Sequence, residues 1–139
     1  MPSSEETTAR APFAYAAIRV VPRVEREEFV NVGVVIFSRP RHYLGVRMHL
    51  DADRLRALWP DLDIAAVERQ LQVIRLVAAG DSSGGAIALL PPTERFGWIS
   101  APASTVVQPG PVHAGLAYDL KAALDDLFTD LVEPIANSR

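Results

Sequence analysis

A valine-rich run at residues 29–37, FVNVGVVIF, constrains the fold more than any other stretch of this chain. Its β-branched residues favour a strand. A second run, at residues 43–50, alternates apolar and polar side chains as a half-buried strand does. Residues 38–41, SRPR, have the chemistry of a turn. These stretches therefore predict a β-hairpin, with residues 29–37 as the central strand of a sheet.

The alternation also predicts which residues of the hairpin face each other. A slip of one residue would turn every side chain to the opposite face, so we expect the aliphatic sets of both strands to share one buried face. The expected pairs are Ile36–Leu44, Val34–Val46, Val32–Met48 and Val30–Leu50. A register shifted by two residues keeps the same faces. In either register Asn31 lies on the other face, opposite His49 or Arg47.

The rest of the chain divides into one further strand and several helices. Residues 13–21 predict a strand that ends at Pro22. Helical spacing then indicates a short helix capped by Asp51 or Asp53, a longer helix from Asp63 to Gly80, and a last helix over about 119–132. Residues 86–90 fit either a short strand or irregular structure.

Strands followed by helices, without strand–helix alternation, predict an α+β fold. We expect an antiparallel sheet, built on a three-stranded N-terminal meander at about 13–50, packed against two or three helices. The length of 139 residues fits one domain. We assign it to residues 13–134, with a flexible tail at 1–12 and a C-terminal tail at 135–139.

Composition excludes several classes of protein. The chain has no cysteine, which excludes disulfide scaffolds, thiol catalysis and cysteine-ligated metal sites. Its net charge of -3 and pI of about 5.6 argue against a nucleic-acid partner. The apolar runs are too short for a membrane span or a signal peptide, so we expect a cytoplasmic protein without a membrane partner.

Patterns for catalysis, metals and cofactors are weak. Ser104, His113 and Asp119 contain the residue types of a catalytic triad, but the chain lacks the G-x-S-x-G motif. His42 and His49 would point to opposite faces of one strand. Neither a metal nor a cofactor is expected. The catalytic residues, if any, are not identified by these patterns, and His113 is the one candidate acid–base group.

Two regions hold the candidate binding residues. The Pro-rich segment 94–113 is expected to be irregular but ordered, since it carries Phe96 and Trp98, and long segments of this kind are usually functional. The second region is the polar cluster expected around Asn31, an unusual residue for a valine-rich strand. The candidates are Arg19, Glu28, Asn31, Arg47, His49, Arg95, Trp98, Ser104, Thr105, Gln108 and His113. Alternatively, these polar side chains satisfy turns and a buried hydrogen-bond network.

Three stretches together resemble a bacterial family catalogued as domain of unknown function 3037. They are FAYAAIRVVPR, EREEFVNVGVVIF and RFGWISAPASTVVQPGPVHAGL, the last followed by an amphipathic helix. The resemblance runs from about Phe13 to Val132. The positions that match the family motifs are Glu28, Asn31, Gly33, Arg95, Trp98, Ser104, Thr105, Gln108, His113 and Gly115. The resemblance implies no reaction, and it implies a protein partner, a HipA-like kinase, that this chain would bind or regulate.

The sequence therefore supports two alternative hypotheses of function. The first is a binding module that recognises a protein partner through the outer sheet face and segment 94–113. The alternative is a small enzyme or ligand-binding protein for an anionic or nucleotide-like molecule. Convergence of Asn31, Gln108 and His113 on one pocket would favour the alternative.

Overall fold

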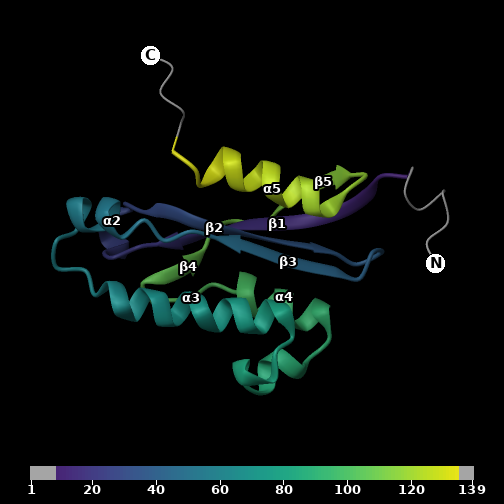
Figure 1. Ribbon diagram of the computed structural model, residues 1–139, viewed down its shortest axis with the longest axis horizontal. Helices are drawn as coiled ribbons and strands as arrows, with labels where there is room; N and C mark the ends of the chain where they lie inside the picture. The colour runs from purple at the N-terminus through teal and green to yellow at the C-terminus, as the bar shows by residue number, and fades with distance from the viewer. Residues whose placement is uncertain (1–8, 135–139) are drawn as a thin grey trace, which may run out of the picture.

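The computed structural model describes residues 9–134 and confirms the α+β fold (Figure 1). The sheet is antiparallel, with the order β3-β2-β1-β4, and β5 also pairs with β1. Its strands are β1 (Ala11–Val20), β2 (Val30–Ser38), β3 (Tyr43–Met48), β4 (Val107–Pro109) and β5 (His113–Ala117). The meander β1-β2-β3 is the one expected. Its first strand begins two residues before the predicted Phe13.

Capping residues set the helix starts that the sequence predicts. The carboxylates of Asp51, Asp63 and Asp119 each accept a hydrogen bond from a backbone N–H of the first turn of a helix. Gly80 ends α3 in the left-handed conformation, with φ 70°. The helices are α2 (Ala52–Leu58), α3 (Ile64–Ala79), α4 (Pro92–Ser100) and α5 (Leu120–Leu131), with 3-10 turns η1 (Val24–Arg26), η2 (Ser82–Gly84) and η3 (Ala86–Leu89).

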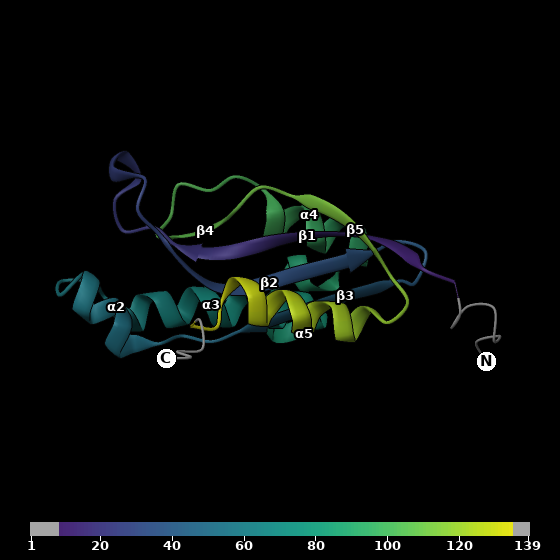
Figure 2. The ribbon, with the colours of Figure 1, turned by 90° about the horizontal axis from the view of Figure 1, so that it is seen from above.

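Helices cover both faces of the sheet. α3 and α4 lie on one face and α5 lies on the other, as Figure 1 shows. Each face has its own core: Val35 packs with residues of α3 and α4, whereas Val34 and Ile36 pack with α5. β2 is therefore buried on both sides. Seen from above in Figure 2, α5 lies over β2 and β3 and leaves β1 beside it.

The predicted register of the hairpin is wrong. The structure pairs Phe37 with Leu44 and Val35 with Val46, one residue away from the expected pairs. The cause is a β-bulge: β1 pairs Ile18 with Gly33 and Arg19 with Asn31, which leaves Val32 as an extra residue on β2. The bulge reverses the alternation of β2 at that point. Because both faces of β2 are buried, its aliphatic pattern did not reveal the reversal.

Segment 94–113 is more regular than predicted. Pro92 starts α4, where its missing N–H costs no helical hydrogen bond. Short strands follow at β4 and β5, both paired with β1. Between them Gly110 donates its N–H to the carbonyl of Ala17 at 2.8 Å. Residues 86–89, which the sequence left open, form a 3-10 turn.

Gly33 is required for the close approach of β2 and β3 at the bulge. A Cβ at this position would overlap Met48 Cγ and lie 3.0 Å from the carbonyl oxygen of Arg47. We expect Gly33→Ala to lower the free energy of unfolding by about 1–3 kcal/mol, the usual range for overpacking. The control is Gly97→Ala in α4, where a Cβ meets no atom within 4 Å. Urea unfolding measures both, and equal stability of the two variants would contradict this account.

Asn31 attaches the end of α5 to the sheet. Its Nδ2 donates to the carbonyl oxygen of Leu131 at 3.1 Å, in the last turn of the helix. We expect Asn31→Val to lower the free energy of unfolding by about 1 kcal/mol, the usual worth of one such bond. The melting temperature would fall by about 3–5 °C. Calorimetry tests this, and an unchanged melting temperature would show that the bond contributes nothing.

Candidate functional site

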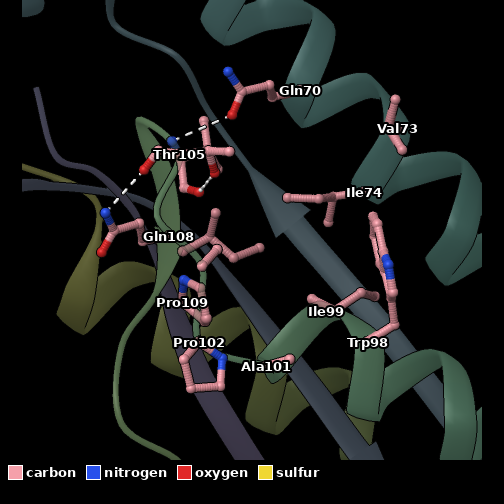
Figure 3. A pocket seen from close by; sticks show the side chains of 13 residues that line it. Gln70, Val73, Ile74, Trp98, Ile99, Ala101, Pro102, Thr105, Gln108 and Pro109 are labelled. Carbon is pink, nitrogen blue, oxygen red and sulfur yellow. Dashed lines mark hydrogen bonds between the residues drawn. The ribbon is translucent and has the colours of Figure 1, made fainter.

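An apolar groove lies between α3, α4 and the segment that leads into β4 (Figure 3). Its volume is about 390 Å³. Val73 of α3 and Trp98 of α4 line it and are 41% and 42% exposed, although both are large and apolar. Trp98 rises from α4 toward α3, beside Ile74. Pro102 and Pro109 lie on the opposite wall.

Each polar side chain that lines the groove makes one hydrogen bond within the protein. The Oε1 atom of Gln70 accepts a hydrogen bond from the N–H of Val107 at 3.3 Å, which ties β4 to α3. Thr105 Oγ1 donates to the carbonyl of Val107 at 2.7 Å, and Gln108 Nε2 donates to the carbonyl of Thr105 at 2.8 Å. None of the lining residues has an ionisable side chain. The groove therefore offers apolar contact rather than acid–base chemistry.

Arg95, a candidate from the sequence, does not line the groove but binds the helix end beside it. Its Nη1 donates to the carbonyls of Val77 and Ala78, at 2.9 and 2.8 Å, and its Nε donates to Leu90 at 2.8 Å. The two carbonyls belong to the last turn of α3, and that of Val77 also accepts a hydrogen bond from the N–H of Gly80 at 3.1 Å. Arg95 thus joins α4 to the end of α3. Ser104 lies exposed in the segment that borders the groove.

Arg47 belongs to a charged cluster at the edge of the α5 side of the sheet. Its guanidinium carbon lies 4.3 Å from the ring centroid of Phe128, and Nη1 lies 3.0 Å from Oδ1 of Asp125. Lys121 hydrogen-bonds the same carboxylate at 3.0 Å and, with Arg47, lowers the pKa of Asp125. Burial raises the pKa of the neighbouring Tyr43 phenol. This cluster fastens α5 over β3.

The other candidates lie away from the groove. Glu28 pairs with Arg26 at 2.8 Å, on the exposed connection between β1 and β2, and this contact lowers the pKa of Glu28. His49 follows β3 and borders a small cavity of about 80 Å³ with Asn31. His113 lies exposed at the start of β5, its ring centroid 5.4 Å from that of Tyr15.

Arg19 takes part in none of these contacts. It lies on β1, on the α5 side of the sheet, with its guanidinium carbon 3.9 Å from the ring centroid of Phe29. Asn31 is its partner across the strands. Within residues 9–134, no three His, Asp or Glu side chains are grouped as a metal site would require. In the same part of the chain, no helix is long and apolar enough to cross a bilayer.

Trp98, Thr105 and Gln108 are therefore the sequence candidates that line the groove together. In the sheet Arg19 lies between Asn31 and Gln108, and His49 shares the small cavity with Asn31. Asn31, Gln108 and His113 do not converge, since each contacts a different part of the chain. Sequence reasoning missed the α3 wall of the groove. Val73 was the available signal, because it is an apolar helical residue outside the stripe that faces the core.

Comparison with known proteins identifies a family. No curated protein and no solved structure matches the chain. The model of a family described as "Protein of unknown function (DUF3037)" matches residues 15–132. This span contains most of β1, all the other strands and every helix, and it includes all the residues that line the groove. The chain therefore belongs to the DUF3037 family.

Proposed function

We propose that this protein is a binding module that holds an apolar segment of a partner protein in the groove between α3 and α4. The observation that carries the proposal is the joint exposure of Val73 and Trp98 on the walls of a groove of about 390 Å³. Large apolar side chains in a concave site mark binding surfaces. Trp is also the residue type most enriched among the hot spots of protein interfaces.

The chemistry of the groove favours a protein segment over a polar substrate. Gln70, Thr105 and Gln108 already use their side chains in internal hydrogen bonds. A polar small molecule would find only the remaining amide atoms of Gln70 and Gln108, and no charged side chain, to orient it, whereas an aliphatic or proline-containing segment needs mainly apolar contact. The bond between Val107 and Gln70 also ties the start of β4 to α3, and the bonds of Thr105 and Gln108 fix the turn before it, so that this wall of the groove is formed before the partner arrives.

A HipA-like kinase is the first partner to test, because the family resemblance implies it. The enzyme alternative needs a group that can act on an anionic substrate. Arg47 and Arg95 already bind a carboxylate and three backbone carbonyls, respectively. The exposed His113 has Tyr15 as its ring neighbour. The groove is thus the stronger basis for a function.

Val73→Glu tests the groove, because it places a charge in the apolar site without disturbing a buried side chain. We expect the affinity for the partner to fall by about 2 kcal/mol or more, as at an interface hot spot. Val24→Glu is the matched control, since Val24 lies in η1, outside the groove, and is 59% exposed. Both variants should keep the wild-type melting temperature.

The measurement has two stages. The tagged wild type and both variants are used for affinity purification from the organism that encodes them, with quantitative mass spectrometry, and the protein enriched is then titrated by calorimetry. Loss of binding in Val73→Glu alone supports the groove. Equal affinity of Val73→Glu and Val24→Glu for the same partner would remove the groove from the interface.

A further inference from the structure

A second feature lies on the other face of the sheet, where α5 leaves β1 uncovered (Figure 2). Tyr15 and Arg19 stand on that face of β1: Tyr15 packs on the α5-side core, and Arg19 follows at an even spacing along the strand. Asn31, the cross-strand partner of Arg19, reaches α5 from the same face. Arg19 therefore stands on the α5 side of the sheet, in the part that this helix does not cover.

The guanidinium of Arg19 is held between two surfaces. On one side lies the ring of Phe29, with its centroid 3.9 Å from the guanidinium carbon. On the other side lies Gly110, where a Cβ would come within 2.8 Å of Arg19 Cζ and 3.0 Å of its Nε and Nη2. The missing side chain at position 110 thus makes room for the cation. An arginine fixed in this way has already lost much of its rotamer entropy before any ligand binds.

This fixed cation has no anion within the described chain. No salt bridge within residues 9–134 involves Arg19. Its Nε is buried and has no hydrogen-bond partner. Leaving a buried donor of a charged group without a partner costs free energy, so buried charges in proteins are normally paired. Arg19 is half-buried and departs from that rule at its Nε, as its cross-strand neighbour Asn31 does at Oδ1.

Arg47 shows what completes such an arrangement. It stands on the same face of the sheet, and its guanidinium also lies over a phenylalanine ring, that of Phe128. In that case Asp125 supplies a carboxylate oxygen 3.0 Å from the guanidinium. The two arginines thus share the aromatic support and differ in the anion. Arg19 thus has a positioned guanidinium and an aromatic ring, as Arg47 has, but no carboxylate partner.

We propose that Arg19 anchors a binding site for an oxyanion, a carboxylate or phosphate group that comes from outside the chain. Guanidinium groups bind both kinds of group through paired, charge-assisted hydrogen bonds. Phe29 and Gly110 hold the cation in place. Arg19 as a whole is half-buried, and its Nη groups, unlike the buried Nε, are the donors that an anion from outside can reach. The site does not depend on the groove, which lies on the face of the sheet covered by α3 and α4.

Titration with sodium acetate and with sodium phosphate, followed by ¹⁵N NMR at constant ionic strength, tests the site. Constant ionic strength removes general screening from the comparison. The reporters are the Nε–H of Arg19 and the backbone N–H of Gly110. We expect a saturable shift of both signals in the wild type. In Arg19→Gln the affinity read from Gly110 should fall about tenfold or more, since charge-assisted bonds are lost.

Gly110→Ala separates the geometry of the site from its charge. The new Cβ would force the guanidinium away from Phe29, while the net charge stays the same, and we expect a similar loss of affinity. Gly97→Ala and Arg75→Gln are the matched controls. The first adds a Cβ in open space, and the second removes an exposed arginine from α3. Both should bind as the wild type does.

Saturation with either salt supports the site, and the preferred salt distinguishes a carboxylate ligand from a phosphate ligand. The proposal is overturned if neither salt gives a saturable shift. It is equally overturned if Arg19→Gln binds as tightly as Arg75→Gln, because the anion would then respond to overall charge alone. A melting temperature for each variant checks that the fold is intact.

Discussion

The burial of β2 on both faces is the constraint on which the rest of the structure depends. A strand in this position must offer apolar side chains to α5 on one side and to α3 and α4 on the other. Its valine-rich sequence meets that demand, but strict alternation would leave Asn31 and Val35 on the same face. The bulge at Val32 reverses the alternation, so that Val35 faces α3 and α4 while Asn31 reaches the last turn of α5.

The parts of the fold that can be predicted from the sequence are those that depend on local signals. The α-helices with an aspartate at the N-cap, α2, α3 and α5, begin where the sequence predicts, since a cap is a local signal. The register of β2 against β3 depends on the bulge, which is a tertiary feature. α4 has no side-chain cap, and β4 and β5 are short, with prolines at 109 and 111. Their pairing with β1 gives them order that their own sequence does not predict.

The candidate site also has a part that can be predicted from the sequence and a part that depends on how the helices pack. Side chains with distinctive chemistry were easy to select from the sequence, but several serve the fold: Arg95 binds the carbonyls at the end of α3, and Asn31 binds the end of α5. The groove consists mostly of residues without polar side chains, and their exposure depends on how α3 and α4 meet. Trp98 stands out in the sequence because a large aromatic residue in a Pro-rich segment is unusual. Val73 is harder to recognise from the sequence, because its only unusual feature is that it is apolar and lies outside the buried stripe of α3.

The two proposed surfaces lie on opposite sides of β4, and the sequence of this edge bears on how a partner can bind. Pro109 ends β4, and Pro111 follows Gly110 before β5 begins. Neither proline has an N–H to offer, so a partner strand cannot form a continuous ladder along this edge. Recognition here must therefore rely on side chains above and below the edge. Those side chains are Trp98 with its apolar neighbours on one face and Arg19, held by Phe29 and Gly110, on the other.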